Sequence, residues 1–192
     1  VDALPAGFDL LDAPVLGSVA EVESGSLQIL VGGDEDVLER CRPVLEALGR
    51  VVAVGPVGAG SAGKLVANAA LLGTIAVVGE ALSLGLRLGL SFDAAFDVLG
   101  ATPLGAQAER RRPSLESGSY PPRFTLALAR KDADLIETAA EAAGVDLRVG
   151  RAVDSWLDDA AAAGLSDLDY SAVLTSIVKG AIPQADREAP TS

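Results

Sequence analysis

The first third of the chain alternates short apolar runs with turn residues. The pattern predicts two strands, a helix and a third strand, at residues 8–16, 26–31, 35–49 and 50–54. Asp34 is suited to cap the helix, because its carboxylate can accept hydrogen bonds from the first backbone N–H groups, and Gly49 is suited to end it. Pro43 lies inside the helical pattern, so we expect it to kink or split the helix.

From residue 61 onward, apolar positions recur with helical spacing. The pattern predicts an all-helical region with elements at 61–89, 91–100, 104–117, 125–144, 148–164 and 169–180. The most apolar run, 65–79, is shorter than the roughly 20 residues that a membrane span needs. We therefore expect a buried core helix there. Residues 181–192 are polar and contain proline, which predicts a loose tail.

Composition limits the chemistry that the chain can perform. The 192 residues contain no histidine, which excludes Ser-His-Asp and Cys-His catalysis and most zinc sites. The net charge of −12 disfavours nucleic acid and anionic membranes as partners. No metal site is expected, and the basic run 110–112 is expected to be a solvated helix end. Acid–base chemistry therefore falls to Lys, Asp, Glu or Tyr.

A glycine-rich stretch at 55–64 fits two phosphate-binding patterns at once. Gly58, Gly60 and Gly63 spell G-x-G-x-x-G, and Gly58, Gly63 and Lys64 spell G-x-x-x-x-G-K. The nucleoside triphosphate pattern fails because Leu65 stands where Ser or Thr should bind magnesium. The dinucleotide pattern lacks a second strand that ends in an acidic residue about 20 residues later.

A third interpretation of this stretch uses Lys64 and Asn68. They are four residues apart and so share one face of a helix that is otherwise apolar. A lysine desolvated there can act as a general acid, and a neighbouring amide can orient a hydroxyl or carbonyl group. The glycines then serve a tight turn and a close approach of another surface. The alternative, a lysine that extends to solvent beside an incidental asparagine, stays open.

Four ordered motifs extend the picture to the whole chain. "LDAPVLG" (11–17), "GSLQILVGGDE" (25–35), "VGPVGAGSAGKLVANAALLG" (54–73) and "ARKDADL" (129–135) follow one another as they do in the β-hydroxyacid dehydrogenases, which this chain resembles. The resemblance implies a mostly α fold. Residues 59–180 would be a helical dimerisation and substrate domain of the 6-phosphogluconate dehydrogenase-like type that begins with a long helix. Residues 1–58 would be a β-β-α-β remnant of a Rossmann-type nucleotide-binding domain.

The resemblance also implies roles for individual residues. Lys64 matches the family's catalytic lysine, which exchanges a proton with the substrate oxygen, and Asn68 matches the substrate-orienting asparagine. Lys131 matches a lysine near the nicotinamide of the cofactor. Gly17 and Ser18 would bind the substrate, with the Gly17 N–H available to a carboxylate and Ser18 replacing a lost hydroxyl. Leu16 departs from the family's serine and makes the pocket more apolar.

The resemblance implies a cofactor-binding site that these residues supply only in part. The family binds NAD or NADP through a glycine loop after its first strand, and no such strand, loop and helix precede residue 50 here. The chain also opens on Val1 and contains no methionine and no recognisable signal peptide. We therefore expect a segment of a cytoplasmic enzyme that binds the dinucleotide poorly or not at all by itself.

The function implied is interconversion of an alcohol and a carbonyl on a small, carboxylate-bearing hydroxy acid, by an NAD(P)-dependent oxidoreductase that forms a homodimer. The segment alone is expected to be inactive. Two alternatives stay open: a non-catalytic helical dimerisation module, and one half of a split enzyme whose nucleotide-binding half is another chain.

Overall fold

The computed structural model describes residues 8–179, and the chain divides into two compact units. The first unit reaches Asn68 and the second begins at Ala69. The tail expected at 181–192 lies outside the described residues. Over the described part, the chain is mostly helical with a small sheet, as the sequence predicts.

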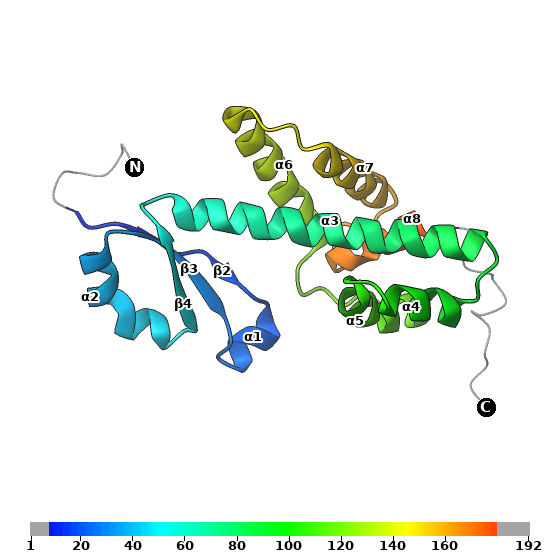
Figure 1. Cartoon of the computed structure of the whole chain (residues 1–192), viewed down its shortest axis with the longest axis horizontal. Helices are drawn as coiled ribbons and strands as arrows, with labels where there is room; N and C mark the ends of the chain where they lie inside the picture. Colours follow the sequence, from blue (N-terminus) through cyan, green and yellow to red (C-terminus); the bar gives the residue numbers. More distant parts are fainter. Residues whose placement is uncertain (1–7, 180–192) are drawn as a thin grey trace. The chain divides into compact units, whose positions relative to one another are not determined.

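The first unit is built on a four-stranded sheet (Figure 1). Its elements are β1 (Leu11–Asp12), β2 (Val15–Leu16), α1 (Val19–Glu23), β3 (Gln28–Gly33), α2 (Glu35–Glu46) and β4 (Arg50–Gly55). Strand β3 is central, because it pairs antiparallel with β1 and β2 on one side and parallel with β4 on the other. Ile29 and Val31 of β3 pack with Leu38 of α2 in a buried core.

Most of the elements predicted for this unit are present, but the single strand expected at 8–16 is two short strands, β1 and β2. Asp34 caps α2 by accepting hydrogen bonds from the backbone N–H groups of Asp36 and Val37. Pro43 was expected to kink or split the helix, and it does not split it, because α2 runs through it to Glu46. Leu45, beyond the proline, packs against the core, and this contact holds the last turn in place. The short helix α1 was not predicted.

The second unit is all helical apart from one isolated bridge between Thr125 and Asp169. Its elements are the greater part of α3 (Ala59–Arg87), α4 (Phe92–Gly100), α5 (Gly105–Ser117), α6 (Leu126–Ala143), α7 (Arg148–Ala162), a short 3-10 turn η1 (Tyr170–Ala172) and α8 (Val173–Ile177). Ser91 and Thr125 cap α4 and α6 through their hydroxyl groups. Helices α6 and α7 pack side by side (Figure 1).

The basic run 110–112 was expected to be a solvated helix end, but two of its arginines contact other elements. The Arg111 guanidinium donates a hydrogen bond to the Tyr170 hydroxyl and lies over its ring. Arg112 pairs with three carboxylates and lies over the ring of Phe96. These arginines fasten α5 to α4 and η1, so their role in the second unit is structural.

Helix α3 is long and apolar enough to cross a membrane by length and composition, and it is the one such helix within residues 8–179. Of its most apolar window, 33% is buried inside the chain. Leu72, Val78 and Leu82 are in the core, whereas Val77, Leu84 and Leu88 are exposed. The expectation of a buried core helix thus holds for one side of α3.

The glycines before and within the start of α3 allow a close approach of helix and sheet. A Cβ atom on Gly60 would lie 2.5 Å from the carbonyl oxygen of Asp12 and 2.6 Å from that of Leu30. A Cβ atom on Gly32 would lie 2.7 Å from the Gly60 nitrogen. Gly58 has φ = +97°, which other residues rarely adopt. The geometry agrees with the third interpretation of this stretch, a tight turn with a close contact.

The Asp12 carboxylate caps the first turn of α3. Its two oxygens accept hydrogen bonds from the backbone N–H groups of Gly58, at 2.8 Å, and Ser61, at 2.6 Å. Burial by itself raises the pKa of Asp12, but the hydrogen bonds from Ser61 and Gly58 outweigh it and hold the pKa below its usual value. The cap therefore requires the charged carboxylate.

Replacing Gly60 by alanine is expected to destabilise the chain by about 1–3 kcal/mol, because the added methyl group meets backbone oxygens that cannot move freely. Gly73→Ala is the matched control, since a Cβ atom there lies 3.6 Å from Val149, an ordinary contact, and alanine favours a helix. Urea unfolding followed by circular dichroism compares the two. Equal midpoints for both variants would contradict the close-contact role of Gly60.

Replacing Asp12 by asparagine is expected to cost about 1–2 kcal/mol at pH 7, because an amide NH₂ group cannot accept from a backbone N–H. The lowered pKa means that this stabilisation is complete above the unfolded value of about 4 and disappears as the pH falls through the folded value. Urea unfolding should therefore show a difference in the free energy of unfolding between the variant and the wild type that is smaller at pH 3 than at pH 7. Asp9→Asn, at an exposed ion pair with Arg40, controls for the loss of charge. A difference independent of pH would contradict the assignment.

Candidate functional site

Lys64 lies in the second turn of α3, close to the loop that follows β2. Its Nζ donates a hydrogen bond to the carbonyl oxygen of Val15 at 2.9 Å, across 49 residues of sequence. The side chain is half-buried. The fold of the first unit therefore brings the ammonium group to the beginning of the Leu16–Ser18 loop, which the family resemblance predicts to bind the substrate.

Asn68 follows one helical turn after Lys64 and is 6% exposed. Few polar side chains are buried as deeply within residues 8–179, where Asp169 and Ser171 are the others. A buried amide is retained only where its polar atoms are satisfied. Its position at i+4 from Lys64 places the amide and the amine on one face of α3.

The loop between β2 and α1 has a fixed shape. Gly17 has φ = +137°, and a Cβ atom there would lie 2.6 Å from Leu27 and 2.8 Å from Glu21. Ser18 follows as the residue before α1, and both its backbone N–H and its hydroxyl donate to Glu21 Oε2 at 2.6 Å. The hydroxyl expected to serve the substrate is thus engaged with a carboxylate of its own helix.

Lys131 belongs to the second unit, near the start of α6. Its Nζ lies 2.7 Å from the carboxylate of the adjacent Asp132. The lysine side chain is 60% exposed, whereas that of Asp132 is 14% exposed. Lys131 can therefore present a positive charge to a ligand while Asp132 stays with the helix. Lys64, Asn68, Gly17 and Ser18, by contrast, all lie in the first unit.

The two residues that sequence reasoning missed are Asp12 and Glu21. Asp12 stands in the "LDAPVLG" motif, but its partner amides are 46 and 49 residues away, so no local pattern reveals the contact. Glu21 had a signal, because Ser18 and Glu21 have the spacing of a capping box. Within residues 8–179, no three His, Cys, Asp or Glu side chains lie close enough together to hold a metal ion.

The glycine stretch does not fit a dinucleotide pyrophosphate. Such a group binds to the free N–H groups at the start of a helix. At the start of α3, the Gly58 and Ser61 N–H groups already donate to Asp12, whose negative charge repels a phosphate. The described residues therefore offer no pyrophosphate site at this helix.

Known proteins match the chain along nearly its whole length. The family model described as NAD-binding of NADP-dependent 3-hydroxyisobutyrate dehydrogenase matches residues 58–177, and that of the NAD binding domain of 6-phosphogluconate dehydrogenase matches residues 2–58. A probable 3-hydroxyisobutyrate dehydrogenase of Mycobacterium tuberculosis is 37% identical over 181 aligned positions, and the match covers 89% of this chain and 61% of the relative. Glyoxylate/succinic semialdehyde reductase 1 of Arabidopsis thaliana is 34% identical, over 89% of this chain and 60% of its own.

A solved structure agrees with these relatives. The 3-hydroxyisobutyrate dehydrogenase of M. tuberculosis, solved with L-serine, superposes with a TM-score of 0.73 at 32% identity and covers 87% of this chain and 60% of its own. The chain thus spans about three fifths of the length of the relatives that it matches. Because one family model covers more than half of the chain, and the relatives carry the same chemistry in their names, the chain belongs to the β-hydroxyacid dehydrogenase family.

Proposed function

We propose that this chain is part of an NAD(P)-dependent oxidoreductase that interconverts an alcohol and a carbonyl on a small hydroxy acid. The observation that carries the proposal is the Lys64 amine, held 2.9 Å from the Val15 carbonyl beside the Leu16–Ser18 loop, with buried Asn68 one turn away. These residues supply an ammonium, an amide and, in this proposal, the backbone N–H of Gly17. That set suits a substrate that carries a hydroxyl or carbonyl beside a carboxylate.

In this proposal, Lys64 manages the proton of the substrate oxygen. During oxidation the hydroxyl gives its proton to the neutral lysine amine, and during reduction the ammonium returns it, while NAD or NADP exchanges the hydride when bound. Asn68 orients the same oxygen through its amide. The N–H of Gly17 binds the substrate carboxylate, Ser18 lies beside it, and Lys131 contacts the cofactor.

Leu16 bears on the substrate class. An isobutyl side chain at the beginning of the loop favours an apolar substituent on the hydroxy acid. The relatives are named for 3-hydroxyisobutyrate and for glyoxylate and succinic semialdehyde, and the M. tuberculosis enzyme was solved with L-serine. These compounds form the first substrate panel to test.

We also propose that residues 1–58 are the remnant of a nucleotide-binding domain, that residues 59–180 are the helical domain, and that these 192 residues alone do not turn over. The Asp12 carboxylate at the start of α3 supports this, because it leaves no pyrophosphate site there. The rivals are a non-catalytic dimerisation module and one half of a split enzyme. The intact mass of the protein as made in its source cells, and the identity of any chain that co-purifies, separate the three.

Replacing Lys64 by alanine in the complete protein isolated from its source is expected to lower kcat by about 10²–10⁴-fold, because the proton of the substrate oxygen loses its acceptor. Lys179→Ala is the control for removal of a positive charge. Nicotinamide absorbance with each substrate and with NAD or NADP measures turnover. The pH profile of kcat should lose its dependence on a basic group in K64A. An unchanged kcat in this variant would overturn the role of Lys64.

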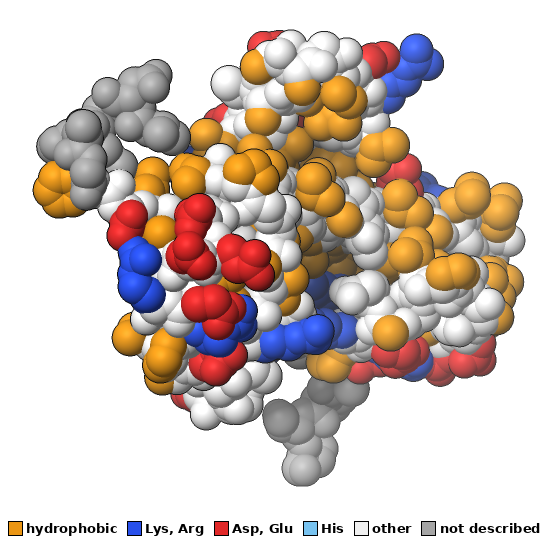
Figure 2. Space-filling model, turned by 60° about the vertical axis from the view of Figure 1, so that its left-hand side comes forward, with side chains coloured by type: hydrophobic (Ala, Val, Ile, Leu, Met, Phe, Trp, Pro, Cys, Tyr) orange, Lys and Arg blue, Asp and Glu red, His pale blue; other side chains and the backbone are white. Residues whose placement is uncertain are grey.

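A homodimer through the helical region is the second part of the proposal. In the second unit, Val77 and Leu84 of α3, and Leu88 directly after its last residue, recur at helical spacing and are 45%, 61% and 75% exposed. Figure 2 shows further apolar side chains exposed on the face that it draws. A second copy of the chain that covers this stripe would remove it from water.

Replacing Leu84 and Leu88 by glutamate is therefore expected to shift the chain from dimer to monomer with little loss of folded structure, because both side chains are exposed in the single chain. Sedimentation velocity measures the change. Leu128→Glu on α6, where the leucine is 48% exposed, is the matched control. A wild-type chain that sediments as a monomer at every concentration would contradict the proposal.

A further inference from the structure

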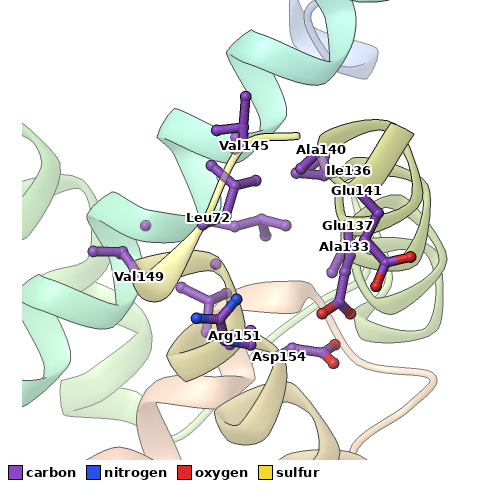
Figure 3. Close-up of a pocket in the computed structure, with 15 residues that line it drawn as sticks. Leu72, Ala133, Ile136, Glu137, Ala140, Glu141, Val145, Val149, Arg151 and Asp154 are labelled. Carbon is purple, nitrogen blue, oxygen red and sulfur yellow. The ribbon is translucent and has the colours of Figure 1, made fainter. Parts of the chain in front are cut away.

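A cavity of about 180 Å³ opens in the second unit between α3, α6 and α7, apart from every residue assigned a role above (Figure 3). The space exists because the facing positions carry small residues. Ala69 and Gly73 on α3 and Ala133 and Ala140 on α6 line the cavity, and their short side chains leave its volume unfilled.

The walls of the cavity are apolar. Leu72, Ala133, Ile136 and Val153 are each less than 10% exposed and form its inner surface. A cavity of about 150 Å³ with walls of this kind takes up benzene. The volume here is therefore enough for a hydrocarbon group of about six carbon atoms.

The rim carries negative charge. Glu137 and Glu141 of α6 and Asp154 of α7 line the cavity, and Figure 3 shows their carboxylates gathered on one side of it. Arg151 also lines the cavity, and it pairs with Asp146 at 2.6 Å, as Arg148 does at 2.9 Å, while Arg130 pairs with Asp158. The lining thus holds three carboxylates against one arginine and keeps an excess of negative charge.

The pKa of Asp154 is raised, in part by this negative charge. Burial raises its pKa first, and the negative charges of Asp158, Asp134 and Glu137 raise it further, against the opposing effect of Arg130. A positive group at the rim would relieve this repulsion. A bare metal ion does not suit the site, because within residues 8–179 no three acidic side chains converge closely enough to bind one.

We propose that this cavity binds a small organic cation, an aliphatic or alicyclic ammonium, whose hydrocarbon part fills the apolar interior and whose charge meets Glu137, Glu141 and Asp154. An anion is repelled at the rim. A neutral alcohol of the same size gains the apolar contact but not the charge interaction. The proposal is independent of the dehydrogenase chemistry, since it uses neither Lys64 nor Asn68.

The test is binding of cyclohexylammonium to the 192-residue chain at pH 7, compared with cyclohexanol and cyclohexanecarboxylate. Binding is followed by calorimetry and by NMR shifts of the Val149 and Val153 methyl groups. The cation is expected to bind about tenfold more tightly than the alcohol, and the carboxylate more weakly than either. Equal binding of the three compounds, or no binding of the cation, would overturn the proposal.

Variants locate the site. The double variant Glu137→Gln, Asp154→Asn should weaken the cation about fivefold or more and leave the alcohol unchanged, whereas Asp159→Asn, on α7 outside the cavity, should change neither. Ala140→Leu should fill the space and weaken both ligands. Circular dichroism checks that each variant keeps the helical content of the wild type.

The variant results also decide against other occupants. If the double variant leaves the affinity for the cation unchanged, or if Ala140→Leu still binds it, the cation binds elsewhere and the proposal fails. If dilution of the chain changes the ligand affinity in step with its sedimentation, a side chain of a second copy occupies the cavity, and the proposal fails in that case as well.

Discussion

The carboxylate of Asp12 is the contact on which the arrangement of the first unit depends. It fastens the end of β1 to the first turn of α3, through the backbone of Gly58 and Ser61. Because Gly32 and Gly60 have no side chains, strand and helix can approach until their backbones touch. This close contact holds the first turns of α3 against the sheet of the first unit, where Lys64 reaches the carbonyl of Val15.

The same contact explains why a glycine-rich stretch that resembles two phosphate-binding motifs binds no phosphate at its helix. In phosphate-binding proteins, the N–H groups at the start of a helix donate hydrogen bonds to a phosphate that comes from solution. Here the anion is a side chain of the protein itself, the Asp12 carboxylate. It caps α3 and occupies the N–H groups that a phosphate would need.

In the second unit, side-chain size and charge shape the surface more than any motif does. Small residues on α3 and α6 leave a cavity, and acidic residues on α6 and α7 surround its rim. In α5, by contrast, Arg111 and Arg112 are occupied by Tyr170 and by the carboxylates around them. The adjacent arginines of α5 therefore serve packing within the second unit. The acidic residues, which are separated in the sequence, lie together at the rim of the cavity.

The sequence alone determined most of the strands and helices, the helix caps at Asp34 and Ser91, and the family. These depend on local periodicity, on short-range hydrogen bonds and on ordered motifs, all of which are written along the chain. Only the tertiary structure decided that α2 continues through Pro43 and that Asp12 meets the start of α3. Leu45, beyond the proline, packs on the core of the first unit. Asp12 accepts from residues 46 and 49 positions away, which no local pattern encodes.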